Sequence, residues 1–236
     1  MVTIHQICYN EVQILEFCYN FYRSRFPKAK FVLEDNESTD GSVELAKSLG
    51  YDVNSFSTNN QMDDTILSNV RNNCWRNDKT DWVIVCDMDE LIDINEDVLM
   101  QEQSNCNTII ETWGFQMINL EYGFDLKNIQ YGFRDGDFYD KNLVFNKRFI
   151  EHMNWSVGSH KCSPTGVLVK KTENRYPLLH YKFINEDYVV ERYKELNLRQ
   201  SPENIAKNMS THYNLSEVEI RENFNQMKKN ELTKLI

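Results

Sequence analysis

Strand-like runs and amphipathic segments alternate along the first ninety residues. Strands are predicted over residues 2–8, 31–34, 53–56 and 82–86, and apolar residues at helical spacing predict helices over 11–23, 42–49 and 62–76. Asp40 or Ser38 is expected to cap the second helix, and Gly50 to end it in the left-handed conformation. This alternation predicts an α/β fold with a mostly parallel central sheet and helices on both faces.

The pattern becomes less regular beyond residue 90. Strands are predicted over 108–112, 115–119, 143–145 and 167–169, whereas 121–141 is rich in Gly, Asp and Tyr without clear periodicity. Helical patterns return after about residue 186, including 216–235, which opens with the capping-box pair Ser216 and Glu219. No linker-like segment interrupts the chain. We therefore predict a single domain over 1–236, with sections at about 1–95, 96–185 and 186–236.

Composition narrows the classes of partner and compartment. The net charge of −10 argues against nucleic acid or an anionic membrane as the main partner. The six cysteines form no CxxC pair, which favours a reducing compartment. Neither a signal sequence nor a long apolar stretch is present, so we expect a cytoplasmic protein without a membrane span.

The apolar run 82–86 ends abruptly in three carboxylates, Asp87, Asp89 and Glu90. Like charges this close resist joint ionisation, and a bound divalent cation is the usual resolution. Oxygen ligands suit Mg²⁺ or Mn²⁺. Ligands of open α/β sheets collect at the carboxyl ends of the strands, so the sequence predicts a metal site after this strand.

Three segments that follow predicted strands resemble the motifs of GT-A-fold, family-2-like glycosyltransferases. They are Tyr9-Asn10-Glu11, the run from Asp35 and Asn36 to Ser42, and Asp87-Met88-Asp89-Glu90, in the order of that family's Tyr-Asn-Glu, Asp-Asn-x-Ser-x-Asp and Asp-x-Asp. Arg71 and Trp75 resemble the family's arginine-bearing helix. Marks of a narrower branch of small enzymes follow at Tyr139-Asp140-Lys141, Gly158-Ser159-His160, Pro164-Thr165-Gly166 and Leu178-Leu179-His180-Tyr181-Lys182. The resemblance covers about residues 3–215.

The resemblance implies metal-dependent transfer of a sugar from a nucleotide-diphosphate sugar to an acceptor hydroxyl, such as that of a glycan, with inversion. It also implies that 1–95 holds the nucleotide sugar, while 96–185 binds the acceptor and completes the metal site. The donor would meet Tyr9, Asn10, Glu11, Asp35, Asn36, Arg71, Asp87 and Lys182. The metal would be held by Asp87, Asp89 and His180, and a histidine ligand would favour Mn²⁺ over Mg²⁺.

The sequence alone does not decide the roles of several residues. An inverting displacement needs a general base, and Asp135, Asp137, Asp140 and His160 are all candidates. His180 is equally interpretable as a core histidine. Arg71 is nearly as consistent with a surface charge as with a phosphate contact.

Three rival functions can be weighed. A haloacid-dehalogenase-like phosphatase would use Asp87 as nucleophile, but that family expects Thr or Val where Leu91 stands, and its motif strand normally comes first. A sugar-nucleotide nucleotidyltransferase would carry a Gly-rich basic loop after the first strand, in place of Tyr9-Asn10-Glu11. A binding module without catalysis is disfavoured by the intact acids.

Overall fold

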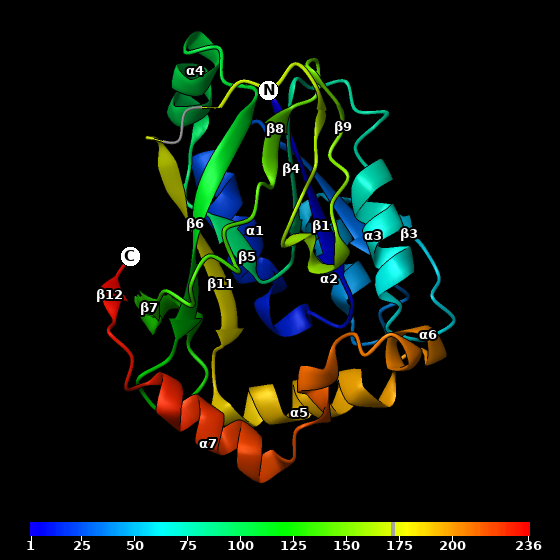
Figure 1. The fold of residues 1–236 in the computed structure, drawn as a ribbon, viewed down its shortest axis with the longest axis vertical. Helices are drawn as coiled ribbons and strands as arrows, with labels where there is room; N and C mark the ends of the chain where they lie inside the picture. Colours follow the sequence, from blue (N-terminus) through cyan, green and yellow to red (C-terminus); the bar gives the residue numbers. More distant parts are fainter. Residues whose placement is uncertain (171–172) are drawn as a thin grey trace.

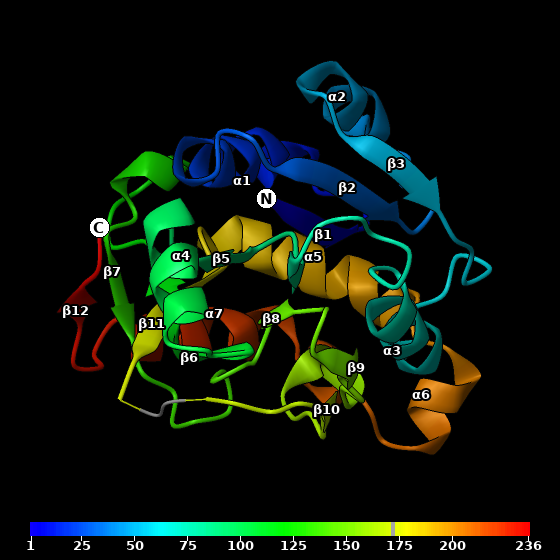
Figure 2. The ribbon, with the colours of Figure 1, turned by 90° about the horizontal axis from the view of Figure 1, so that it is seen from above.

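The computed structural model describes residues 1–170 and 173–236. Within these residues, ten strands join one sheet in the order β12-β7-β6-β8-β4-β1-β2-β3, with β11 paired to β5 and β6 (Figures 1 and 2). Two further strands, β9 (Ile150–His152) and β10 (Thr165–Gly166), form a small separate ribbon.

The first half alternates strands and helices as predicted. Its strands are β1 (Val2–Cys8), β2 (Lys30–Asp35), β3 (Asp52–Ser55) and β4 (Trp82–Asp87), and its helices are α1 (Val12–Arg25), α2 (Ser42–Leu49) and α3 (Asp64–Asn73). β3, β2, β1 and β4 are all parallel. Figure 2 shows α1 and α2 on one side of these strands and α3 on the other. The predicted α/β fold with a mostly parallel central sheet is confirmed.

The second half adds antiparallel strands and short helices. The elements are β5 (Glu90–Ile92), α4 (Glu96–Ser104), β6 (Ile109–Ile118), η1 (Leu126–Asn128), β7 (Tyr131–Phe133), β8 (Val144–Asn146), η2 (Val157–Ser159), β11 (Arg175–Phe183), α5 (Glu186–Leu198), α6 (Pro202–Ala206), η3 (Thr211–Asn214), α7 (Glu217–Met227) and β12 (Thr233–Lys234). β11 runs parallel to β6 and points at α5, which crosses beyond the strand ends (Figure 1). Neither α4 nor β11 was predicted from the sequence.

Three predicted strands need correction. The strands expected over 108–112 and 115–119 form one continuous strand, β6, which pairs with β11 on both sides of Gly114. Gly114 itself allows a close approach of Tyr139, since a Cβ there would lie 2.3 Å from the Tyr139 carbonyl oxygen. The strand expected over 167–169 is wrong. Those residues are exposed and irregular, and the neighbouring strand is β10.

Helix ends also differ in part from prediction. The capping box of Ser216 and Glu219 is confirmed, but α7 ends at Met227 rather than continuing to 235. The chain then turns, and Thr233–Lys234 pairs with β7. Gly50 ends α2 with φ 90°, as predicted. Asp40 does not occupy the N-cap of α2, which is Gly41; its carboxylate accepts from the backbone N–H of Ser42 and of Val12, in the first turns of α2 and α1.

The apolar core lies mainly between α1 and the sheet, with smaller clusters below α3 and between α5 and α7. This packing fixes the carboxyl ends of β1, β2, β4 and β11 on the side of the molecule that faces α5 (Figure 1). Among the helices that the structure describes, none combines the length and apolar character that a membrane span requires.

Candidate active site

A cavity of about 1010 Å³ lies between these strand ends and the C-terminal helices. Nine of the residues singled out from the sequence line it: Tyr9, Glu11, Asn36, Arg71, Asp87, Asp89, His160, His180 and Lys182. Asp135, one of the base candidates, also lines it. The fold therefore brings together side chains that are up to 173 positions apart (9 to 182) in one concave site.

Four other predicted residues lie outside the cavity lining. Asp35 is buried and accepts from the backbone N–H of Ser38, so it shapes the loop after β2. Asn10 bonds the Thr39 N–H and the Glu195 carboxylate. Asp137 is exposed.

Asp140, the fourth of these residues, is held by groups of the second half of the chain. Its carboxylate pairs with Arg134 and accepts from the Gly114 N–H at 2.9 Å. Bonds to these donors lower the pKa of Asp140 although burial opposes the charged form. A carboxylate engaged in this way is poorly placed to accept a substrate proton.

Asp87 is positioned by Arg71. The guanidinium Nη2 lies 2.5 Å from Asp87 Oδ1, and Arg71 is only 6% exposed, so its interpretation as a surface charge does not hold. Burial opposes the charge on Arg71, but Asp87 raises the pKa of the guanidinium above its ordinary value. Both groups line the cavity, and no hydrogen-bond partner is found for the second carboxylate oxygen of Asp87 among the described residues.

Asp89 faces His180 across the floor of the cavity. His180 Nε2 lies 3.2 Å from Asp89 Oδ2, while Nδ1 lies 2.8 Å from Gln116 Oε1. With Nδ1–H donating to that amide oxygen, Nε2 holds a lone pair directed at a carboxylate, and a cation placed between two such acceptors satisfies both. Without a metal, Nε2 can instead carry a proton and donate to Asp89; burial opposes ionisation of Asp89, yet a protonated His180 holds the pKa of that carboxyl well below its usual range.

These donors suit a divalent metal, and the three-residue ligand set of Asp87, Asp89 and His180 stays a prediction. Among the described residues, Asp87, Asp89 and His180 do not bring their ligand atoms within 4.8 Å of one another. Asp89 and His180 supply one oxygen and one nitrogen, and Asp87 is engaged by Arg71. One or two protein ligands plus phosphate oxygens and waters is the usual arrangement for a nucleotide-bound Mg²⁺ or Mn²⁺.

Glu90 is a structural acid rather than a ligand. It is 1% exposed, forms an ion pair with the buried Lys141, and accepts from the backbone N–H of Asp87 at 3.1 Å. The pair fixes the turn that carries Asp87 and Asp89. Lys141 is marked in the sequence only by the resemblance of Tyr139-Asp140-Lys141, and its burial was not predicted, since a lysine in an irregular segment is normally exposed.

Lys182 presents a positive charge to the cavity. Its ammonium lies 5.0 Å from the ring centroid of Tyr193 and 5.2 Å from that of Tyr213. No carboxylate pairs with it among residues 1–170 and 173–236. Burial lowers its pKa to about 8. Lys182 is therefore a cation available to an anionic ligand.

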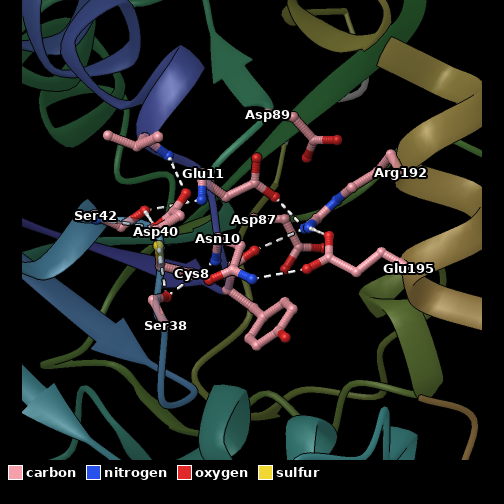
Figure 3. Close-up of polar contacts among 12 residues, drawn as sticks. Cys8, Asn10, Glu11, Ser38, Asp40, Ser42, Asp87, Asp89, Arg192 and Glu195 are labelled. Carbon is pink, nitrogen blue, oxygen red and sulfur yellow. Dashed lines mark hydrogen bonds and ion pairs between the residues drawn. The ribbon is translucent and has the colours of Figure 1, made fainter. Parts of the chain in front are cut away.

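Helix α5 holds the loop after β1 through a network that the sequence did not reveal (Figure 3). Arg192 pairs with Glu11 at 2.5 Å and donates to the Tyr9 carbonyl oxygen at 2.8 Å. Glu195, one turn further on, accepts from the Asn10 side chain at 2.7 Å. Only an i,i+3 spacing of Arg192 and Glu195 is visible in the sequence, and it carries no information about partners 180 residues away.

His160 lies at the rim of the cavity. Its Nδ1 donates to the Phe138 carbonyl oxygen at 3.0 Å, and its ring stacks on that of Phe138 with centroids 3.8 Å apart. Burial lowers the pKa of His160 to about 4, so the imidazole is neutral at pH 7 with its lone pair on Nε2. Gly158, at φ 66°, makes room for the ring: a Cβ there would lie 2.7 Å from Nε2.

Comparison with known proteins gives matches among solved structures alone. No protein-family model and no curated protein matches the chain. The crystal structure of S. aureus TarS is similar to 96% of this chain, with 13% identity and a TM-score of 0.45, and this chain spans 43% of that one. TarS 1–349 in complex with UDP-GlcNAc has 10% identity and a TM-score of 0.44, and the match covers 96% of this chain and 71% of that one. The mannosyltransferase PcManGT from Pyrobaculum calidifontis, in complex with GDP-Man and Mn²⁺, has 12% identity and a TM-score of 0.43, and the match covers 96% of this chain and 73% of that one.

Proposed function

We propose that this protein is a metal-dependent glycosyltransferase of GT-A type, which moves a sugar from a nucleotide-diphosphate sugar to an acceptor hydroxyl. The observation that carries the proposal is the Asp89–His180 pair on the cavity floor, with the unpaired Lys182 in the same cavity. A divalent cation and a diphosphate complement these groups together. The motif resemblance of the first half supports the same assignment, and the six free thiols favour a reducing compartment such as the cytoplasm.

The nucleoside end of the donor is assigned to the wall formed by the loops after β1 and β2. Tyr9 lines the cavity, and the Arg199 guanidinium lies 3.2 Å from its ring centroid. Asn36 lines the same region, and the free oxygen of Asp87 is assigned to the ribose. Arg192 keeps this wall in place through Glu11.

The diphosphate is assigned to the centre of the cavity. Departure of the nucleoside diphosphate loads negative charge onto its β-phosphate, and a bound metal supplies Lewis-acid stabilisation of that charge. Lys182 adds a preorganised positive charge in a partly buried site, where it is stronger than in water. Asp89 and His180 are the residues that would hold the metal.

His160 is the base that the geometry favours for an inverting transfer. It lines the cavity, is neutral, and has no hydrogen-bond partner at Nε2 among the described residues, whereas Asp140 is bound by Arg134. Nε2 would take the proton of the acceptor hydroxyl as that oxygen attacks the anomeric carbon from the face opposite the diphosphate. Asp135 is the second candidate, because it is exposed and also lines the cavity.

The phosphatase alternative fits this geometry less well. Asp87, its required nucleophile, is held against Arg71 in a charge-assisted bond that lowers its reactivity as a nucleophile. The nucleotidyltransferase alternative lacks its Gly-rich loop, and the loop that follows β1 is instead tied to α5 by Arg192 and Glu195.

A thermal-shift experiment tests the proposal. Purified protein is melted with Mn²⁺ alone, with UDP, GDP or TDP alone, and with each nucleotide plus Mn²⁺. We expect a marked rise in Tm only for one nucleotide combined with Mn²⁺, since a ligand at about 100 times its Kd adds about 2.7 kcal/mol to the stability. A panel of sugar nucleotides of that base then identifies the donor. No shift with any pair, together with hydrolysis of a generic phosphomonoester, would overturn the proposal in favour of a phosphatase.

A further inference from the structure

A second polar cluster lies on the face of the sheet that α3 covers. His5 on β1 and Glu34 on β2 point to this face, because their neighbours Ile4 and Leu33 point into the core beneath α1. Cys74, at the C-terminal end of α3, meets them there, and Asp78 approaches from the turn that follows. None of these four residues lines the cavity described above.

The donor atoms of this cluster converge. One ring nitrogen of His5, a Glu34 carboxylate oxygen and Cys74 Sγ all lie within 4.8 Å of one another, and no other three His, Cys, Asp or Glu side chains do so within residues 1–170 and 173–236. His5 Nδ1 is 2.8 Å from Glu34 Oε1. The cluster is interior, with His5 1% exposed and Glu34 4% exposed.

The second ring nitrogen of His5 makes the contact that metal-binding histidines make. Nε2 lies 2.8 Å from Asp78 Oδ2. Ligating imidazoles commonly donate their other N–H to a carboxylate, which fixes the tautomer and leaves a lone pair for the metal. Here that pairing leaves Nδ1 directed at Glu34 and Cys74.

The charges in the cluster favour a cation. Two carboxylates and a thiol share one imidazole in the protein interior. A divalent cation that replaced the proton on Nδ1 and the thiol proton would place positive charge between these acceptors, with both protons released to solvent.

We propose that His5, Glu34 and Cys74 bind a single zinc-class cation, with Asp78 orienting the imidazole. Nitrogen, thiolate and carboxylate ligands together suit Zn²⁺ or Co²⁺, in contrast to the Mg²⁺ or Mn²⁺ expected beside Asp89. The ion would join β1 and β2 to the end of α3. Cys74 follows Arg71 by one helical turn, so the ion would also fix the helix end from which Arg71 reaches Asp87.

Cobalt spectroscopy tests this inference without use of any enzymatic activity. The purified protein is stripped with a chelator and titrated with Co²⁺, while thiolate-to-cobalt charge-transfer absorption and bound metal per chain are measured. We expect one equivalent of Co²⁺ with a thiolate band, displacement of the band by Zn²⁺, and a Tm raised by Zn²⁺ alone. A parent protein that shows no thiolate band on addition of Co²⁺ contradicts the proposal, whatever its variants do.

Three variants locate the ion. Cys74→Ser is expected to remove the band, and Cys162→Ser is expected to keep it. Cys162 is a suitable control because its thiol is half-buried and packs, like that of Cys74, against the apolar cluster below α3. Asp89→Asn is expected to keep it as well, because that carboxylate belongs to the other site. A band that survives Cys74→Ser, or is lost in Cys162→Ser instead, would place the metal elsewhere. These readouts do not depend on whether the protein transfers sugars.

Discussion

The two walls of the cavity differ in charge and in origin. The wall from the first ninety residues carries several acids, among them Glu11, Asp89 and Glu90. The facing wall, from residues 116–227, carries mainly cations, imidazoles and aromatic rings, with Asp135 as an acid. Each of these three acids pairs with a group from the other half: Arg192, His180 and Lys141 in turn. Asp87 is the exception, since its partner Arg71 comes from α3. The site therefore forms only when both halves of the chain are folded together.

The largest effect on stability should come from breaking the buried ion pair between Lys141 and Glu90, which joins the two walls. Lys141→Met leaves Glu90 buried without its cation, and removal of one partner of a buried pair typically costs about 3–5 kcal/mol. We expect a loss of this size in the free energy of unfolding, measured by urea denaturation. The double variant Lys141→Met with Glu90→Gln should recover part of it, because the unpaired charge is gone.

The exposed pair Lys207–Glu203 provides the matched control. Lys207→Met should change the free energy of unfolding little, because solvent screens that ion pair. If Lys141→Met were no more destabilising than Lys207→Met, the two walls would not be coupled through Glu90.

The sequence predicted the acidic wall far better than its partner. Asp87 and Asp89 follow an apolar run, and Tyr9 and Glu11 follow the first strand, so local pattern was enough. Nothing local marks Arg192, and Lys141 is marked only by the resemblance of Tyr139-Asp140-Lys141; their contacts span 181 and 51 positions. β11, which carries His180 and Lys182, was missed because Pro177 and mixed polarity hide its strand pattern, and tertiary pairing with β6 decides it.

The next largest effect concerns the Asp89–His180 pair on the cavity floor. Asp89→Asn removes the carboxylate that faces His180, and transfer activity should fall by about 10²–10³-fold, comparable to the loss of one preorganised electrostatic group. Mn²⁺-dependent nucleotide binding, measured by calorimetry, should be lost together with activity, while the unfolding midpoint without ligands stays close to that of the parent.

Asp140→Asn and Asp137→Asn are the controls for Asp89→Asn. Both residues lie outside the cavity lining, so activity should stay within a few-fold of the parent protein. Full Mn²⁺-dependent nucleotide binding by the Asp89→Asn protein would show that the metal is held elsewhere. A large loss of activity in Asp140→Asn with intact folding would restore Asp140 as a candidate base.

The smallest expected effect concerns the rim, where Phe138 buries His160. Burial lowers the pKa of His160 to about 4, so the neutral base persists as the pH falls and protonates only near that value. We expect kcat/KM to change by less than about twofold between pH 7 and pH 5.5 through this group, whereas a base of ordinary histidine pKa would lose several-fold.

Phe138→Ala exposes the imidazole, raises its pKa towards the ordinary value, and should move the acid limb of the pH profile upwards. The backbone bond from Nδ1 to the carbonyl of residue 138 remains in that variant, so the tautomer is unchanged. An acid limb that stays in place in Phe138→Ala would assign proton removal to a carboxylate such as Asp135, and the two walls would then both act through acids.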